Sequence, residues 1–229
     1  IPALTLLSGL GWTFLSPKQC MAYRGGKQDE VVLRPVLREV LSARTFMADG
    51  QVCRLSDKAI DNLISQVCSP ALNEGLLKAN ERMYNHLLYG IALTEFVDGK
   101  KVNPTVALID WAHPENNQFH FTEEFTVLRS GGVETRRPDI VCFVNGIPLA
   151  VLEAKRPDGH GNKGPTTDEG ISQSIRNQRN DEIPQLFVYS QLLLSINGHD
   201  GRYGTCHTPM KFWAAWREED ITDGQMLAL

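Results

Sequence analysis

Two short apolar runs joined by Asn145-Gly146 constrain the fold of this chain more than any other feature of its sequence. The runs span 140–144 and 147–152, and they are apolar at both alternate and intervening positions. Asn-Gly is favoured in two-residue β-hairpin turns. Strands that are apolar on both sides are typical of the centre of a sheet covered on both faces. The sequence therefore predicts a hairpin at the centre of such a sheet.

Helical patterns dominate the first half of the chain. We expect helices over residues 1–10, over 28–45 with an interruption at Pro35, from a cap at Ser56 through Cys68, and from a cap at Asn73 through Leu88.

Strand patterns follow in the second half. They lie at 91–97, 106–110, 119–127 and 192–196, with a helix capped by Thr167 or Asp168 that runs to about Asn180. Residues from 212 onward are interpreted as the start of a linker or docking segment. Helices followed by a meander of strands, a helix and another strand predict an α/β fold, with a sheet sandwiched by helices.

Composition restricts the classes of protein to consider. The net charge is −4, so nucleic-acid binding would require a local basic patch or a partner. No run of about 18 apolar residues suggests a membrane span, and we expect a soluble, cytoplasmic protein. The five cysteines are scattered, which favours reduced thiols over disulfides or a zinc site.

Two acids and a lysine fall on the two arms of the predicted hairpin. Asp139 directly precedes the first run, and Glu153 and Lys155 close the second, where they share one face of the strand. A strict two-residue turn would place Asp139 opposite Leu152, with Glu153 on the other face. A three-residue loop or a bulge would place Asp139 opposite Glu153. Because catalysis needs both acids on one face, we predict the three-residue loop or the bulge.

This constellation fits hydrolysis of a phosphodiester bond. Two carboxylates about 5 Å apart across a strand pair attract a hard divalent cation such as Mg²⁺, and the backbone carbonyl of Ala154 could be a further ligand. Lys155 could orient a water and stabilise charge on the phosphate. The alternative is an exposed Glu/Lys pair at a strand end with Asp139 as a turn residue. Buried charges at the end of an apolar strand are costly unless they are paired or bind a metal, which favours the catalytic interpretation.

The string from Arg137 to Lys155, RPDIVCFVNGIPLAVLEAK, resembles the PD-(D/E)xK nuclease motif. More narrowly, it resembles the N-terminal nuclease domain of the R (restriction and motor) subunit of type I restriction enzymes. Further segments similar to this family flank the string at Asn80-Glu81 with Tyr84, 108–111, 114–119, 183–187, 197–198 and 203–205.

The resemblance implies a restriction-endonuclease-like fold in which a mixed central sheet is flanked by helices. Within it we expect a helical N-terminal region at 1–72, a nuclease core at 73–208, and a linker or docking segment at 209–229. The implied function is Mg²⁺-dependent cleavage of double-stranded DNA by Asp139, Glu153 and Lys155. Implied partners are the methyltransferase (M) and specificity (S) subunits.

The same resemblance implies that ATP-driven translocase domains follow in the natural protein. This chain has no GxxxxGK[ST] motif, so we expect ATP to bind only there. Two alternatives stay open: a catalytically silent DNA-docking or assembly module of the same fold, and another PD-(D/E)xK nuclease from repair or a mobile element.

Supporting residues are less sharply defined. The family often carries Gln-x-x-x-Tyr after the lysine. Here Gln173 has Asn177 four residues on, and Gln185 with Tyr189 fits the letters at a later position. We assign a positioning role to Gln173, with an exposed helix glutamine as the alternative. Glu81 is a candidate third acid, or a structural residue.

Basic residues near the motif are candidates for phosphate contacts, with a solvated face as the alternative. They are Arg129, Arg136, Arg137, Lys155, Arg156, Lys163, Arg176 and Arg179.

Overall fold

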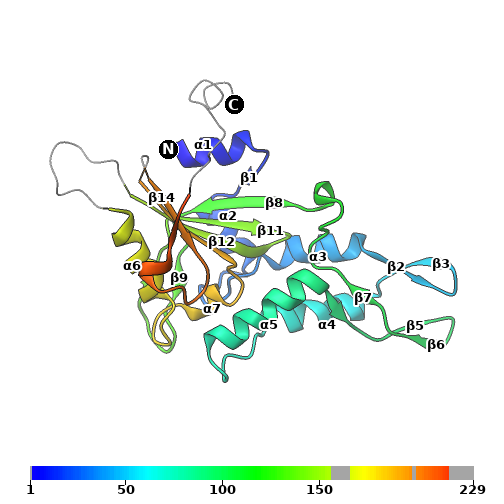
Figure 1. Ribbon diagram of the computed structural model, residues 1–229. Coiled ribbons are helices and arrows are strands. Elements are labelled where there is room, and N and C mark those ends of the chain that lie inside the picture. Colours follow the sequence, from blue (N-terminus) through cyan, green and yellow to red (C-terminus); the bar gives the residue numbers. More distant parts are fainter. Residues whose placement is uncertain (1, 156–165, 198–199, 217–229) are drawn as a thin grey trace.

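A seven-stranded mixed sheet forms the centre of the molecule (Figure 1). The computed structural model describes residues 2–155, 166–197 and 200–216. The strand order is β1 (Thr13–Phe14), β8 (Phe119–Glu123), β11 (Ile140–Val144), β12 (Ile147–Ala154), β13 (Leu192–Ile196), β14 (Gly201–Gly204) and β15 (Ala214–Ala215). The pairs β1–β8 and β12–β13 are parallel and the others antiparallel. This arrangement confirms the α/β fold with a mixed central sheet.

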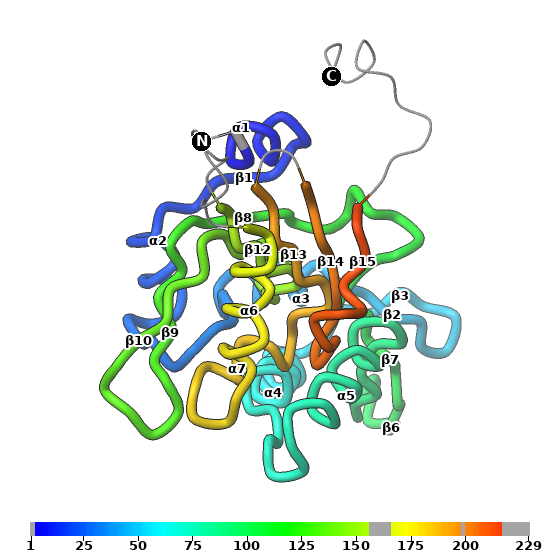
Figure 2. Tube along the Cα trace, turned by 60° about the vertical axis from the view of Figure 1, so that its left-hand side comes forward, coloured from blue at the N-terminus to red at the C-terminus, as the bar shows by residue number. Residues whose placement is uncertain are grey.

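Helices cover both faces of the sheet. They are α1 (Pro2–Gly9), α2 (Pro17–Tyr23), α3 (Arg34–Ala43), α4 (Asp57–Cys68), α5 (Leu76–Tyr89), α6 (Thr167–Asn177) and α7 (Pro184–Phe187), with the short 3₁₀ turns η1 (Pro114–Asn116) and η2 (Met210–Phe212). Residues from α2 to α7 share one large apolar core with the sheet, while α1 packs on a smaller cluster on the other face (Figure 2). No described helix is long and apolar enough to cross a membrane.

Four two-stranded ribbons surround the sheet. They pair β2 (Thr45–Ala48) with β3 (Gln51–Arg54), β4 (Ile91–Ala92) with β7 (Thr105–Val106), β5 (Glu95–Val97) with β6 (Lys100–Val102), and β9 (Val127–Leu128) with β10 (Thr135–Arg136). The β2–β3 and β5–β6 hairpins project together from one end of the molecule (Figure 1), joined by a 2.9 Å ion pair between Lys100 and Asp49.

The predicted helices are confirmed in position, with corrections at their ends. α4 has the predicted limits, and Ser56 Oγ accepts a hydrogen bond from Ala59 N at 3.2 Å. The interruption at Pro35 was wrong, because Pro35 lies in the first turn of α3, where its missing N–H is tolerated. The cap at Asn73 was also wrong, since Gly75 precedes α5 with φ +89°. Thr166 occupies the cap position of α6, just before the predicted residues.

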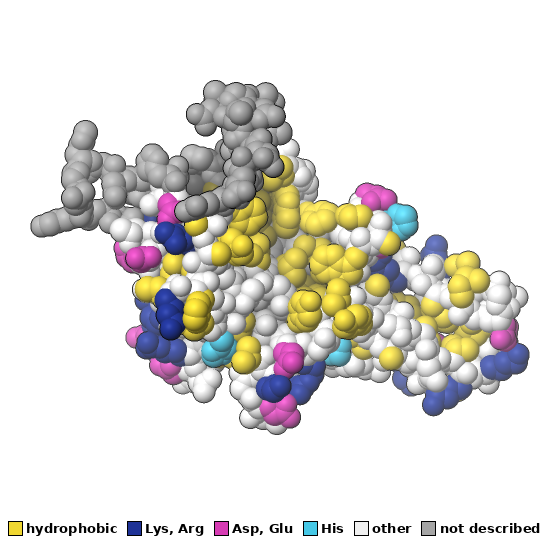
Figure 3. Space-filling model, viewed as in Figure 1, with side chains coloured by type: hydrophobic (Ala, Val, Ile, Leu, Met, Phe, Trp, Pro, Cys, Tyr) yellow, Lys and Arg dark blue, Asp and Glu magenta, His cyan; other side chains and the backbone are white. Residues whose placement is uncertain are grey.

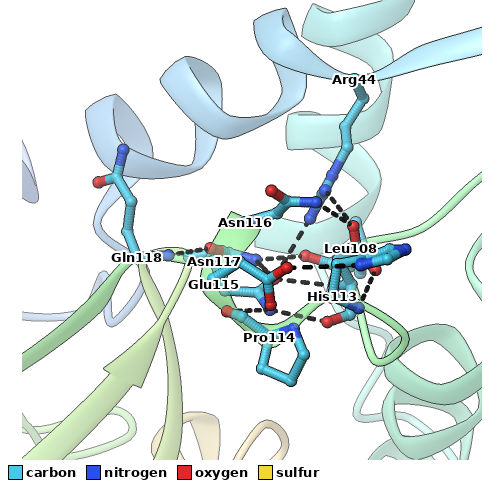
Figure 4. Close-up of polar contacts among 10 residues, drawn as sticks. Arg44, Leu108, His113, Pro114, Glu115, Asn116, Asn117 and Gln118 are labelled. Atoms are coloured by element: carbon cyan, nitrogen blue, oxygen red, sulfur yellow. Dashed lines mark hydrogen bonds and ion pairs between the residues drawn. The ribbon is translucent and has the colours of Figure 1, made fainter.

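The predicted strand at 106–110 ends after Val106, because beyond it side chains, not a neighbouring strand, form hydrogen bonds with the backbone (Figure 4). Asn117 Oδ1 accepts from the N–H of Asp110 at 2.9 Å, and Asn117 Nδ2 donates to the carbonyl of Asp110 at 2.8 Å. Asn145 Nδ2 also donates to Asn117 Oδ1 at 2.8 Å and to the Leu108 carbonyl. This buried amide network ties the loop to the turn of the central hairpin.

Other strand predictions need smaller corrections. Residues 91–97 split into β4 and β5, and 119–127 splits into β8 and the start of β9. The described end of the predicted linker supplies the edge strand β15, which pairs with β14. Trp213 is buried there against Gly204, where an added Cβ would lie 2.9 Å from the indole ring. The division of the chain at residues 72 and 208 stays a prediction.

The central hairpin combines a tight turn with a bulge. Asn145 and Gly146 have φ values of +53° and +81°, as a type I′ turn requires. Val144 pairs with Ile147 across this turn. Between Cys142 and Phe143 the register shifts, because Phe143 pairs with Pro148 and Cys142 with Ala150. Leu149 is therefore the extra residue of a β-bulge, which confirms the second of the two predicted solutions.

Candidate active site

The bulge brings the two predicted acids to the same side of the sheet. Ile140 lies opposite Leu152, so Asp139, one residue earlier, lies opposite Glu153. Asp139 Oδ2 accepts a hydrogen bond from Ala154 N at 2.8 Å. Lys155 Nζ lies 3.9 Å from Asp139 Oδ2 and 3.8 Å from Glu153 Oε2. The structure thus joins Asp139, Glu153 and Lys155 at one end of β12.

Helix α6 packs directly over this end of the sheet. A Cβ on Gly170 would lie 3.2 Å from Glu153 Cβ and 2.2 Å from Ser195 Oγ, so only glycine allows this approach. Ser195 Oγ donates to the Thr167 carbonyl at 2.7 Å and fixes the start of the helix on β13. The close contact places the first turns of α6 over the side chain of Glu153.

Gln173, further along α6, contacts the lysine. Its Oε1 accepts a hydrogen bond from Lys155 Nζ at 2.5 Å. The second candidate pair lies elsewhere, because the Tyr189 hydroxyl donates to the Val67 carbonyl and Gln185 Nε2 donates to the Leu128 carbonyl, both at 2.7 Å. Asn177, at the position of the family's tyrosine, is buried and accepts from Arg176. Of the two candidate glutamines, Gln173 is therefore the one that contacts Lys155.

Burial makes Glu153 an unusual acid. Its side chain is 5% exposed, and its pKa is raised to about 8, with burial as the largest cause. The negative charge of Asp139 and a hydrogen bond with it contribute to this raised pKa, while the positive charges of Lys155 and Arg176 oppose it. Lys155 and Arg176 therefore do not offset the free-energy cost of ionising the buried Glu153. A cation bound between the two carboxylates would stabilise the ionised form of Glu153.

The donor set fits a hard divalent cation. Asp139 and Glu153 offer carboxylate oxygens, and Ala154 lies between the acid and the lysine in sequence. Within the described ranges, no group of three or more His, Cys, Asp or Glu side chains is placed to hold a metal ion. A cation bound here would take few protein ligands, as Mg²⁺ does when water and phosphate complete its shell.

The remaining predicted residues are placed less centrally. Arg137 is exposed and lies 3.5 Å from Glu124, and Arg176 donates to its neighbour Asn177 at 3.2 Å. Glu81 pairs with Lys78 at 2.8 Å on the exposed side of α5, a helix remote from the end of β12 in both views (Figures 1 and 2). Arg156 and Lys163 lie outside the described residues.

Two predicted phosphate-binding residues have another partner. Arg136 Nε lies 2.6 Å from Glu182 Oε2, and Arg129 Nε lies 3.2 Å from the same oxygen. Both arginines hold the β9–β10 ribbon on the loop before α7. Sequence reasoning missed Glu182, which is far from them along the chain.

Glu124 was also missed. It lies within the strand predicted at 119–127, but β8 ends just before it, and it adopts a left-handed conformation with φ +50°. Its N–H donates to the Asp139 carbonyl at 2.9 Å. Glu123, Glu124 and Asp139 line a cavity of about 200 Å³ beside the site. The adjacent acids Glu123 and Glu124 were the sequence feature that could have indicated this position.

Comparison with known proteins gives a consistent result. A family model described as the type I restriction enzyme R protein N terminus matches residues 1–212. The type I restriction enzyme HindI endonuclease subunit of Haemophilus influenzae is 28% identical over 96% of this chain and 20% of its own length. The putative type I restriction enzyme MjaVIIIP endonuclease subunit of Methanocaldococcus jannaschii is 28% identical over 95% of this chain and 20% of its own. The chain thus spans about a fifth of these relatives.

Proposed function

Because this chain belongs to the family of type I restriction enzyme R protein N termini, we propose that it is the Mg²⁺-dependent endonuclease domain of such a protein. Its substrate is double-stranded DNA. The observation that carries the proposal is the bulge-dependent convergence of Asp139, Glu153 and Lys155. In a silent docking module of the same fold, nothing would require the two acids to share a face.

Each residue has a distinct role in this proposal. Asp139 and Glu153 hold Mg²⁺, which when bound supplies an acidified water and offsets negative charge on the scissile phosphate. The hydrogen bond from Ala154 N holds one oxygen of Asp139 and so orients the carboxylate. Lys155, oriented by Gln173, keeps its ammonium between the acids, where it can donate to the attacking water or to a phosphate oxygen.

The chain's longer relatives suggest the wider setting. We infer that DNA cleavage is coupled to ATP-driven translocation by domains that come after this one. M and S subunits act as cytoplasmic partners, and the S subunit provides sequence recognition. This division of labour agrees with the net charge of −4, since the domain itself need not read bases.

A cleavage assay on the complete assembly tests the proposal. The full R protein with M and S subunits, Mg²⁺ and ATP is given plasmid DNA, as wild type and as Asp139→Ala. We expect cleavage to fall at least about a thousandfold, with ATP hydrolysis retained. Asp29→Ala, at an exposed acid, is the matched control and should cleave normally. Undiminished cleavage by Asp139→Ala would overturn the proposal.

A further inference from the structure

Among the residues that the structure describes, those on the α1 side cover only part of the width of that face of the central sheet. α1 packs on Phe121, Ile140 and Cys142 through Ala3, Leu4 and Leu7. α6 contacts β13 and β14 from the opposite face, where Gly170 meets Ser195. On the α1 side, Leu194 and Ile196 of β13 are half-buried, Tyr203 is 38% exposed and Trp216 is 52% exposed.

The exposed residues form one continuous apolar surface. Leu152, Leu194 and Tyr203 lie in one row, because they are direct neighbours across β12, β13 and β14. A Cβ on Gly201 would lie 3.5 Å from Trp216 Cβ and 3.8 Å from Ile196 Cγ2, which places these two side chains in the next row. The rings of Tyr203 and Trp216 are 5.6 Å apart. We call these five residues the open face.

An apolar sheet face of this kind is expected to be buried against another layer. Single exposed apolar side chains are normal, but a contiguous group marks an interaction surface. In Figure 3, hydrophobic side chains are exposed beside the strands of the sheet and also toward α5, which packs on the opposite face of the sheet from α1. None of the five residues carries a charge, so the open face is unsuited to the phosphates of DNA.

The position of Trp216 indicates what covers the open face. The edge strand β15 ends at Ala215, directly before Trp216, at the rim of this surface. The HindI and MjaVIIIP subunits are about five times as long as this chain. We propose that the open face is the docking surface for the polypeptide beyond residue 229 in the longer R protein. This inference rests on the proposed function only in placing the chain at the start of such a protein.

Docking at the open face would act close to the candidate active site. Leu152 of the open face and Glu153 are consecutive residues of β12, and they point to opposite faces of the sheet. A segment packed on Leu152 and Leu194 would therefore hold the strand that positions Glu153. Docking at the open face would thus fix the endonuclease domain rigidly against the polypeptide beyond residue 229.

Hydroxyl-radical footprinting read by mass spectrometry tests the docking. The 229-residue chain and the full-length R protein are labelled in parallel. We expect oxidation of Tyr203 and Trp216 to fall about fivefold in the full-length protein, because an interface core excludes water. Met47 and Phe96, 64% and 68% exposed on the projecting hairpins, are matched controls and should label equally in both. Equal labelling of Tyr203 and Trp216, or protection in the 229-residue chain that rises with its concentration, would overturn the proposal.

Substitutions make the test specific. In the full-length protein, Tyr203→Asp should restore labelling of Trp216, whereas Phe96→Asp should not. Tyr203→Ser serves instead if circular dichroism shows that the aspartate variant unfolds. Continued protection of Trp216 in the folded Tyr203 variant would refute the docking surface. Asp139→Ala should leave the protection unchanged, so failure of the nuclease proposal would be seen separately, in the cleavage assay.

Discussion

Replacing Glu153 by glutamine tests the electrostatics of the site without reference to DNA. In the folded chain, burial and the neighbouring charge of Asp139 raise the pKa of Glu153 from 4.5 to about 8. Glutamine has nearly the same shape and stays neutral at every pH. We expect Glu153→Gln to become more stable than wild type as the pH rises.

The sign follows from proton binding. Between pH 4.5 and about 8, the unfolded chain has lost the proton of Glu153 while the folded chain keeps it. The folded state therefore binds more protons, and the free energy of unfolding of wild type falls as the pH rises through this window. A change of one in pKa corresponds to about 1.4 kcal/mol. The stability gap between variant and wild type should thus widen by about 3–5 kcal/mol from pH 5 to pH 8.5.

Urea unfolding at several pH values, with EDTA present, measures this gap. Other titrating groups, such as His86 and His120, contribute equally to both proteins and cancel in the difference. Glu182→Gln is the matched control. Arg136 lowers the pKa of that buried acid, so its ionisation does not change across the window. Mg²⁺ at about one hundred times its Kd should restore about 2.7 kcal/mol to wild type at pH 8.5 and less to Glu153→Gln. A gap that stays constant with pH would refute the reasoning.

Three further substitutions probe the packing around the site. Gln173→Ala frees Lys155, and we expect cleavage by the full assembly to fall about 10- to 100-fold with ATP hydrolysis unchanged; undiminished cleavage would show that the contact is dispensable. Asn145→Ala removes a buried amide from a left-handed turn position and should cost about 2–4 kcal/mol in urea unfolding, and a loss below about 1 kcal/mol would contradict this role. Gly170→Ala should cost about 1–3 kcal/mol through its clash with Ser195, partly recovered in the double variant with Ser195→Ala. A neutral Gly170→Ala would disprove the close approach of α6.

The central hairpin shows how far sequence reasoning reached. The turn was evident from Asn145-Gly146, and the need for one extra residue followed from the chemistry of Asp139 and Glu153. Both strands are apolar on both sides, so no polar residue marks which face each position occupies. The missed signal was Pro148, which lies in the central strand β12 beside the extra residue Leu149. Proline has no N–H to donate to the neighbouring strand, so within a sheet it is confined to edges and bulges.

Contacts between distant segments explain most of the remaining differences. Arg129 and Arg136 were candidates for phosphate contacts because they lie close to the nuclease motif in sequence. The folded chain supplies Glu182 from a loop some 46 residues beyond Arg136. Gln173 could not be distinguished from an exposed helix residue until the close packing of α6 brought it to Lys155. Local patterns predicted the longer helices and the central hairpin but missed short elements such as α2 and β14. Pairing across the sheet, which brings Asp139 opposite Glu153, could be tested only in the folded structure.

The bulge at Leu149 determines whether the number of residues between Asp139 and Glu153 must be odd or even. A two-residue turn with regular pairing leaves an even number of residues between cross-strand neighbours, but residues 140–152 between Asp139 and Glu153 are odd in number. The turn cannot take the extra residue, since Gly146 is already closed against α3, where an added Cβ would lie 2.5 Å from the Leu33 carbonyl oxygen. Deleting any one residue from the hairpin would therefore place the side chain of Asp139 or Glu153 on the opposite face of the sheet. To keep both acids on one face, related sequences must preserve an odd number of residues between them. The exact number matters less.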